Sequence, residues 1–175
     1  MSEPKRYTGV WCPSVTPFDK DGKLDLAALE THFARLSDAG IDGILLMGSI
    51  GEFTALSMDE RLSLLHAARD MSRLPLIANV SATCLDDMAR LSDTAYSEGY
   101  DAVMVLPHYY FAQTPRQLEA YFDMLDARFE GEWLIYNFPV RTGCDVDAAL
   151  VAKLAARFSR FMGIKDTVDC ASHTR

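Results

Sequence analysis

The sequence predicts an α/β protein with a parallel sheet, specifically a (β/α)8 TIM barrel of which this chain supplies about the first six strands. Three observations predict it. Short apolar runs alternate with amphipathic helical patterns, with a period of roughly thirty residues that suits repeated strand–helix units. The runs are almost continuously apolar, as in strands buried on both faces. Polar residues gather where several runs end, which is typical of barrels that collect their chemistry at the carboxyl ends of strands.

Six short apolar runs are the expected strands. They occupy residues 9–17, 43–48, 76–80, 102–107, 133–139 and 161–167. Polar side chains stand at or near the ends of these runs: Thr16, Ser49, Asn79, Tyr109, Tyr136 and Lys165. A doubly wound open sheet is the alternative architecture. The Gly-x-Gly-x-x-Gly loop of its dinucleotide-binding form does not follow the first run, so the barrel fits the pattern better.

Amphipathic helices are expected between the strands. The first has its apolar face between residues 26 and 36 and stops at Gly40, because glycine commonly follows a helix end. The second begins at a capping box, in which Ser57 caps the helix and Glu60 reaches back. Both boundaries place a helix directly between two of the apolar runs.

The later helices carry similar signals. The third opens near Thr83 and places Leu85 on its apolar face. The fourth begins within residues 114–117, where threonine, proline and glutamine stand in the order of an N-cap, a first helical residue and a capping-box partner. A fifth helix has its apolar face within residues 150–158. The alternation of strand and helix therefore continues along the whole chain.

Charge and composition argue against several kinds of partner. Lys and Arg number 17 against 25 Asp and Glu, a net charge of −8, which disfavours nucleic acid and anionic membrane surfaces. No apolar run approaches the roughly eighteen residues of a membrane span, and residues 1–6 do not lead into an apolar signal segment. The four cysteines and four histidines lack metal-ligand spacing. We therefore expect a cytoplasmic protein with reduced thiols, no metal and no cofactor.

The length of the chain conflicts with a closed barrel. A chain of 175 residues suits one domain, whereas a complete barrel takes about 250 residues. Six strands alone leave two sheet edges unpaired, which folded proteins avoid. We therefore expect residues 1–175 to be a single (β/α) barrel domain that is truncated at its C-terminus.

Lys165 is the first candidate for chemistry. It ends the apolar run 161–164, so it is expected at the carboxyl end of a buried strand. Burying an ammonium group is costly, so such a position favours the free amine that attacks a carbonyl to form a Schiff base. Tyr136 ends the preceding run, and neighbouring strands lie about 4.8 Å apart, so its phenol can move protons at the amine. The alternatives are a lysine that reaches solvent and a core tyrosine with a satisfied hydroxyl.

A glycine-flanked loop follows the second run. Ser49 and Ile50 lie between Gly48 and Gly51, and glycines allow the main chain to approach a ligand closely. A helix N-terminus near this loop favours an anionic group such as a carboxylate. The alternative interpretation is an ordinary turn.

Three motifs together resemble a known family. They are Gly48-x-x-Gly51-Glu52, Tyr136-Asn137-x-Pro139 and Gly163-Ile164-Lys165. In this order, on the second, fifth and sixth expected strands, they resemble the dihydrodipicolinate synthase / N-acetylneuraminate lyase family of pyruvate-dependent class I aldolases. The resemblance extends from Gly9 to Thr167. It implies a (β/α)8 barrel that is usually a homotetramer and acts on pyruvate or another 2-oxo acid together with an aldehyde.

The resemblance also implies roles for single residues. Lys165 would form the Schiff base, and Tyr136 would be the acid and base that moves protons at the substrate. Ser49 and the main chain of Ile50 would hold the pyruvate carboxylate. Tyr109 would match the tyrosine that completes a hydroxyl relay in the site of a neighbouring subunit.

Arg141 would match the arginine that binds the carboxylate of the second substrate in dihydrodipicolinate synthases. A guanidinium offers the bidentate geometry that such recognition needs. A solvated loop charge is the alternative interpretation.

One position departs from the family pattern. The synthases carry two threonines between the glycines, whereas this chain has Ser49 and Ile50, so one hydroxyl is missing. The nominal activity is 4-hydroxy-tetrahydrodipicolinate synthase of lysine biosynthesis. The alternatives are a 2-keto-3-deoxy sugar acid aldolase or dehydratase, or an N-acetylneuraminate lyase. A different class of protein, a non-catalytic barrel paralogue or fragment that binds a 2-oxo acid, also stays open.

Overall fold

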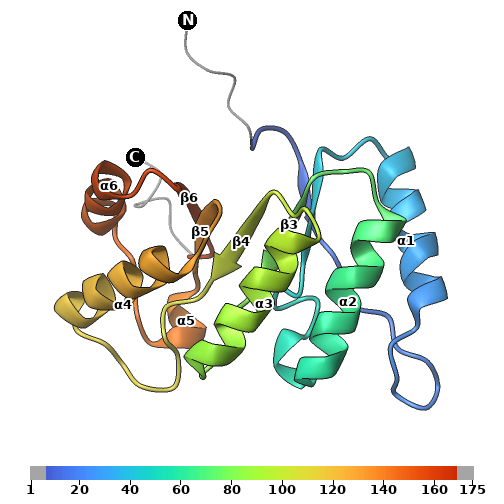
Figure 1. The fold of residues 1–175 in the computed structure, drawn as a ribbon, viewed down its shortest axis with the longest axis horizontal. Coiled ribbons are helices and arrows are strands. Elements are labelled where there is room, and N and C mark those ends of the chain that lie inside the picture. Colours follow the sequence, from blue (N-terminus) through green and yellow to red (C-terminus); the bar gives the residue numbers. More distant parts are fainter. Residues whose placement is uncertain (1–6, 169–175) are drawn as a thin grey trace, which may run out of the picture.

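A computed structural model describes residues 7–168, and within them it contains a six-stranded sheet whose order follows the chain (Figure 1). Each strand pairs in parallel with the next. The strands are β1 (Trp11–Pro13), β2 (Gly43–Leu46), β3 (Leu76–Asn79), β4 (Ala102–Val105), β5 (Trp133–Asn137) and β6 (Phe161–Asp166). The predicted parallel α/β architecture, with the first six strands of a barrel, is confirmed. Each strand is shorter than the apolar run that predicts it.

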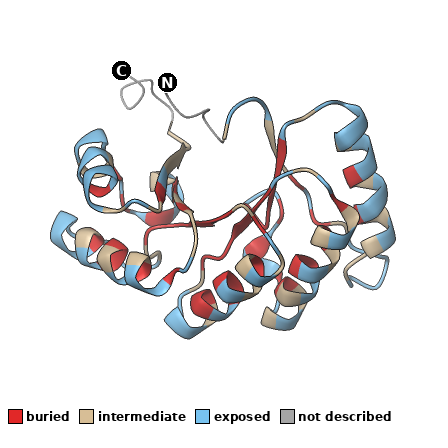
Figure 2. Ribbon diagram, turned by 45° about the horizontal axis from the view of Figure 1, so that its top comes forward, coloured by how far each residue is buried: buried red, intermediate tan, exposed pale blue. Residues whose placement is uncertain are grey.

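The helices lie on the outer, convex side of the curved sheet, and the inner side carries no helix among the described residues (Figure 2). The α-helices are α1 (Leu26–Asp38), α2 (Met58–Met71), α3 (Leu85–Ser97), α4 (Pro115–Arg128), α5 (Pro139–Thr142) and α6 (Ala148–Arg157). A short 3-10 helix, η1 (Phe53–Ala55), precedes α2. Neither η1 nor α5 is expected from the sequence, because both are single turns with too few residues to show a period.

Capping determines where the predicted helices begin. Ser57 and Glu60 form the expected capping box of α2, and Thr114 and Gln117 form that of α4. Leu85, which the sequence places on the apolar face of the third helix, is the first residue of α3 and is 41% exposed, so that placement is wrong. A side chain in the first turn of a helix can project past the sheet. The spacing of apolar residues in the sequence does not show this.

An aromatic cluster fixes the last two strands against their helices. The Trp133 ring is fully buried, and its centroid lies 4.8 Å from that of Phe161 on β6. Phe122 and Phe129 from the α4 region pack on the same indole, at 6.0 and 6.4 Å. The indole nitrogen donates to Asp126 at 2.9 Å, so this large side chain is buried without an unpaired polar atom. The cluster holds β6, which carries Lys165, in register with β5.

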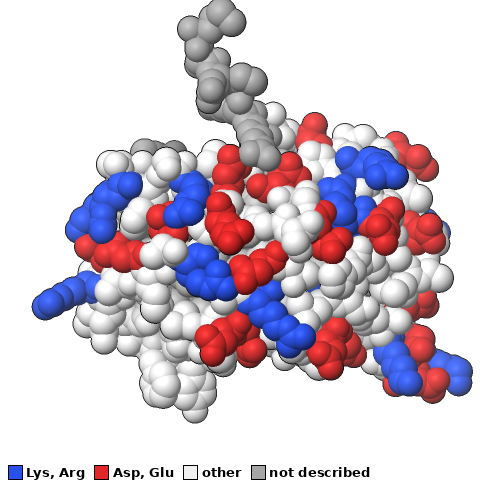
Figure 3. All heavy atoms as spheres, in the orientation of Figure 1, with Lys and Arg blue, Asp and Glu red and all other residues white. Residues whose placement is uncertain are grey.

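The surface carries charges of both signs. Acidic and basic side chains are interspersed over the face shown in Figure 3. No helix within residues 7–168 has the length and apolar character needed to cross a membrane. Cys12, Cys84 and Cys144 are free thiols. Cys170 and residues 1–6 lie outside the described residues.

Candidate active site

Lys165 and Tyr136 are direct partners at the carboxyl end of the sheet. The parallel register of β5 and β6 places Tyr136 opposite Lys165. The lysine amine lies 3.8 Å from the centroid of the tyrosine ring, where the negative ring face attracts a cation. The amine also donates to Thr167 Oγ1 at 3.1 Å. The expected contact between amine and tyrosine is therefore present, although Lys165 is only half-buried because β6 is an edge strand of the described sheet.

Tyr136 connects the lysine to the glycine-flanked loop. Its side chain is 3% exposed, and its hydroxyl forms a hydrogen bond of 3.0 Å with Ser49 Oγ, in which either oxygen can donate. Ser49 itself is exposed on the loop after β2. The Lys165 amine on β6, the Tyr136 ring and hydroxyl on β5, and the Ser49 hydroxyl on the loop after β2 thus form one series of contacts.

The loop around Ser49 depends on a close main-chain approach. A Cβ atom at Gly51 would come 3.0 Å from the Ser14 carbonyl oxygen and 3.2 Å from Met47 Cα, so a larger residue would displace the loop. Thr16 Oγ1 donates to the Gly51 carbonyl at 2.7 Å. The loop that follows β2 is therefore also bound to the segment that follows β1. Ile50 points outward, with 57% of its surface exposed.

A cavity of about 360 Å³, here called the rim cavity, brings together three more of the predicted residues. Ser49, Tyr109 and Arg141 all line it. Its remaining walls are Phe53, Thr54, Leu106, Phe138 and Thr142. The Arg141 guanidinium lies 5.9 Å over the Phe138 ring, and the lining residues include one cation and no carboxylate. Such a lining favours a ligand with an anionic or hydroxylated end.

Tyr109 is half-buried in the wall of the rim cavity. Its ring meets the Phe53 ring edge-on, with centroids 6.3 Å apart. Burial raises the pKa of Tyr109, and the nearby Arg61 guanidinium offsets part of that rise. The phenol is therefore held in its protonated form, which can donate a hydrogen bond.

Lys165 lines a different cavity, here called the interior cavity, of about 270 Å³ on the inner side of the sheet. Its other walls are Tyr7, Trp11, Pro13, Leu45, Ile77, Met104, Leu134 and Ile164. The predicted residues are therefore divided between two cavities. Tyr136 joins them, because its ring contacts the amine and its hydroxyl contacts Ser49.

Asn137 is a further site residue, quoted in the sequence only as part of a motif. Its amide donates to Asp145 at 2.9 Å and to Asp166 at 2.8 Å. Its main-chain carbonyl accepts from Thr167 N at 2.9 Å. It therefore fixes the two residues that directly follow Lys165. The sequence signal for this role is an asparagine at the end of an apolar run, and the structure shows that its amide is fully buried.

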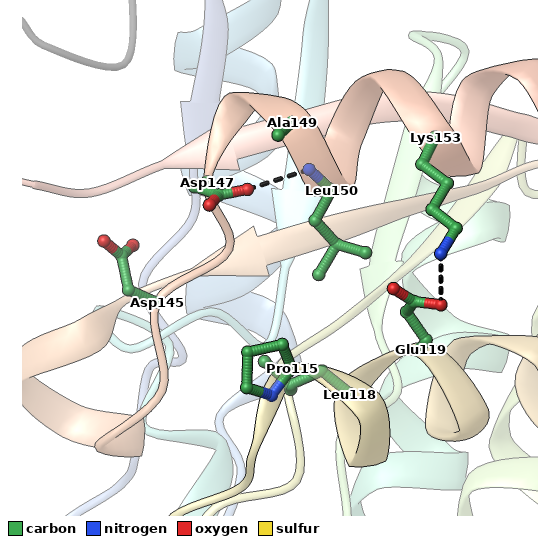
Figure 4. Close-up of a pocket in the computed structure, with 8 residues that line it drawn as sticks. All are labelled: Pro115, Leu118, Glu119, Asp145, Asp147, Ala149, Leu150 and Lys153. Atoms are coloured by element: carbon green, nitrogen blue, oxygen red, sulfur yellow. Dashed lines mark hydrogen bonds and ion pairs between the residues drawn. The ribbon is translucent and has the colours of Figure 1, made fainter.

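Another cleft, of about 250 Å³, lies between the starts of α4 and α6 (Figure 4). Its polar side chains have structural partners. Asp147 accepts from Leu150 N at 2.8 Å and so caps α6, and Glu119 pairs with Lys153 at 2.5 Å. The cleft shares no lining residue with the rim or interior cavity. It is a groove between two packed helices and carries none of the predicted residues.

Comparison with known proteins decides the family. The model of the dihydrodipicolinate synthetase family matches residues 6–175. The chain belongs to this family. The resemblance drawn from the three motifs is therefore confirmed.

Relatives within the family differ in their named activities. The 4-hydroxy-tetrahydrodipicolinate synthase of Synechococcus is 36% identical over 80% of this chain and 47% of its own length. A 2-dehydro-3-deoxy-phosphogluconate/2-dehydro-3-deoxy-6-phosphogalactonate aldolase of Saccharolobus solfataricus is 33% identical over 94% of this chain and 55% of its own. The chain spans about half the length of these relatives.

A solved structure shows the same fold. The crystal structure of YagE, a prophage protein from E. coli K12 in the dihydrodipicolinic acid synthase family, in complex with pyruvate, matches with a TM-score of 0.91 and 34% identity. The match covers 95% of this chain and 57% of YagE. The described strands thus correspond to part of the longer barrel of that family.

Proposed function

We propose that this chain carries the Schiff-base machinery of a class I lyase or synthase that joins or cleaves pyruvate, or another 2-oxo acid, and an aldehyde. The observation that carries the proposal is the contact series from the Lys165 amine to the Tyr136 ring, and from the Tyr136 hydroxyl to Ser49. The pyruvate bound to the related YagE supports the same substrate class.

The proposed reaction begins at Lys165. Its free amine adds to the C2 carbonyl carbon of the 2-oxo acid, and the resulting carbinolamine loses water to give a protonated imine. Loss of a C3 proton converts the imine to an enamine, whose C3 attacks the aldehyde carbon; in the reverse direction the C3–C4 bond breaks. Water then hydrolyses the imine and returns the amine.

Four other residues serve this chemistry in the proposal. Tyr136, in contact with both amine and Ser49, moves protons onto and off the carbinolamine oxygen. Ser49 and the main-chain N–H of Ile50 hold the carboxylate of the 2-oxo acid. Tyr109 extends the hydroxyl relay in a neighbouring subunit of a homotetramer. Sedimentation velocity of the full-length protein tests whether it forms that tetramer.

Borohydride reduction in the presence of pyruvate tests the proposal. Reduction of the imine fixes the adduct, so peptide mapping is expected to show a pyruvate-sized mass increase on the peptide that contains Lys165. Lys153, which pairs with Glu119 in the helical cleft, is an internal control and stays unmodified. An unmodified Lys165 at saturating pyruvate contradicts the proposal and favours a non-catalytic barrel.

The aldehyde half of the substrate is a finer proposal. Arg141 in the rim cavity suits an aldehyde that carries a second carboxylate, which supports 4-hydroxy-tetrahydrodipicolinate synthase and a place in lysine biosynthesis. Ile50, which lacks the second hydroxyl of the synthases, and the named aldolase relatives support a 2-keto-3-deoxy sugar acid aldolase.

A substrate panel separates these activities. It compares condensation of pyruvate with aspartate semialdehyde against cleavage of 2-keto-3-deoxy sugar acids and of N-acetylneuraminate. The Arg141→Gln variant sharpens the comparison. It is expected to lose condensation with aspartate semialdehyde about a hundredfold if the guanidinium binds that carboxylate.

A further inference from the structure

Arg61 on α2 is a buried cation that the proposed chemistry does not use. The residue is 5% exposed, and arginine is almost never buried to this extent without a charged partner. Its guanidinium donates to the main-chain carbonyls of Asn79 and Ser81, both at 2.9 Å. Within residues 7–168 it forms no ion pair, and its Nε has no hydrogen-bond partner. Burial lowers the pKa of Arg61 to about 10, so the group stays charged at neutral pH.

The two carbonyls belong to a buried polar network that reaches the neighbouring strands. Asn79 Nδ2 donates to the Met47 carbonyl at 2.7 Å. Met47 has a φ of 55°, which is uncommon for a residue with a side chain, and it immediately precedes the glycine-flanked loop that contains Ser49. On the other side, Ser81 Oγ accepts from Leu106 N at 2.8 Å. The network thus ties together the carboxyl ends of β2, β3 and β4.

The same guanidinium lies behind the aromatic wall of the rim cavity. It lies 5.7 Å from the centroid of the Phe53 ring, and Phe53 meets Tyr109 edge-on. A single cation on α2 therefore contacts, directly or through one intermediate group, both segments that carry Ser49 and Tyr109. A lysine could not bind two carbonyls in one plane, because its ammonium lacks the planar fork of a guanidinium.

We propose that Arg61 is a positioning residue of the candidate site. It holds the Ser49 loop in the arrangement that binds the carboxylate of the 2-oxo acid, and it holds the segment that carries Tyr109 in place for the hydroxyl relay. The inference rests on the proposed function. It predicts that loss of the guanidinium weakens substrate binding even in molecules that are fully folded.

Arg69 provides a matched control on the same helix. It too donates to main-chain carbonyls, those of Ser72 and Leu74, with the Leu74 bond at 3.2 Å. These carbonyls follow the C-terminal end of α2, whereas Arg61 lies in its first turns. Arg69→Met therefore removes a similar interaction from the opposite end of the helix and is expected to leave pyruvate binding unchanged.

The first test measures borohydride trapping of pyruvate at Lys165 as a function of pyruvate concentration, in full-length wild type, Arg61→Met, Arg61→Lys and Arg69→Met. Irreversibly unfolded molecules lower the amount trapped but not the half-saturating concentration, whereas reversible unfolding raises that concentration; trapping is therefore measured well below the unfolding midpoint of each variant. We expect that concentration to rise about tenfold in Arg61→Met and by a smaller factor in Arg61→Lys. An equal half-saturating concentration in Arg61→Met and Arg69→Met overturns the inference.

The second test does not depend on pyruvate. Amide hydrogen exchange is expected to become faster at residues 47–51 and 106–109 in Arg61→Met and to stay unchanged there in Arg69→Met. If wild type traps no pyruvate, the proposed function is wrong. Amide hydrogen exchange then still tests whether Arg61 positions the two segments. Unchanged exchange in both segments overturns that role. If Arg61→Met does not fold, Ser81→Ala removes the acceptor of Leu106 N and is expected to accelerate exchange at residues 106–109.

Discussion

The central strands β2, β3 and β4 are buried along their whole length, whereas β6 is fully buried only at Phe161. The two regions contribute different parts of the candidate site. The buried centre supplies the loop of Ser49 and the polar network that fixes it. The half-buried edge supplies the amine of Lys165, which the proposed substrate would have to reach. A buried frame and the proposed nucleophile thus lie on different strands, and Tyr136 contacts both Lys165 and Ser49.

The largest expected effect comes from removing the contact between Tyr136 and Ser49. Tyr136→Phe keeps the aromatic ring beneath the amine but removes the hydroxyl that contacts Ser49. We expect proton transfer at the substrate to slow by about 10²–10⁴-fold, the usual contribution of a positioned acid or base. Exchange of the pyruvate C3 protons with deuterated water, followed by NMR, measures enamine formation without knowledge of the aldehyde.

Tyr100→Phe is the matched control for this substitution. The Tyr100 hydroxyl is also buried, but it donates to the Leu65 carbonyl on α2 at 2.9 Å. Its removal is expected to leave the exchange rate of pyruvate unchanged. Equal exchange rates in wild type and Tyr136→Phe contradict the role of the phenol.

A pair of isoleucines tests the difference in burial directly. Ile44 on β2 is completely buried, and Ile164 on β6 is only partly buried. Ile44→Ala is expected to lower the free energy of unfolding by about 2–5 kcal/mol, because the residual cavity adds to the lost burial. Ile164→Ala is expected to cost roughly half as much, in proportion to the apolar area that it hides. Urea unfolding measures both, and equal losses contradict the distinction between centre and edge.

Alkaline pH tests the packing of helices on the sheet. Burial raises the pKa values of Tyr96, Tyr100 and Tyr121, and each hydroxyl donates to a main-chain carbonyl. The unfolded chain releases these protons near its ordinary pKa of about 10. Stability is therefore unaffected below that pH and falls above it, by up to about 1.4 kcal/mol per tyrosine for each pH unit. Urea unfolding at about pH 8 and about pH 11 measures the loss, and equal stability at both contradicts it.

The smallest effect is expected in the cleft between α4 and α6. Lys153→Met removes the ion pair with Glu119, whose side chains are 51% and 30% exposed. Such pairs contribute about 0–1 kcal/mol, so the midpoint of urea unfolding is expected to change little. Pyruvate trapping at Lys165 is expected to stay at the wild-type level. A loss of trapping would place part of the site in this cleft.

Much of the fold follows from sequence pattern, because strand alternation and capping are local. The capping box at Ser57 and the start of α4 at Thr114 are found where the sequence predicts them. The pairing of Tyr136 with Lys165 also follows, because equivalent ends of parallel strands meet at one edge. The positive φ of Met47 could not be predicted, since the Met47 carbonyl accepts a hydrogen bond from Asn79 on another strand.

The division of the site between two cavities is likewise beyond the sequence. It depends on which face of each strand a side chain occupies and on how far neighbouring loops extend. Arg61 was not identified from sequence either, because an arginine in the first turns of an amphipathic helix resembles a solvated charge. Its burial appears only when α2 packs over the end of β3.

A crystal structure of the full-length protein with pyruvate tests whether Lys165 forms the proposed Schiff base. We expect continuous electron density from Lys165 Nζ to C2 of the substrate. We also expect the carboxylate within hydrogen-bond distance of Ser49 Oγ and the Ile50 N–H, and the Tyr136 hydroxyl adjacent to C2. Pyruvate bound elsewhere, or an unmodified Lys165 at saturating pyruvate, would contradict it.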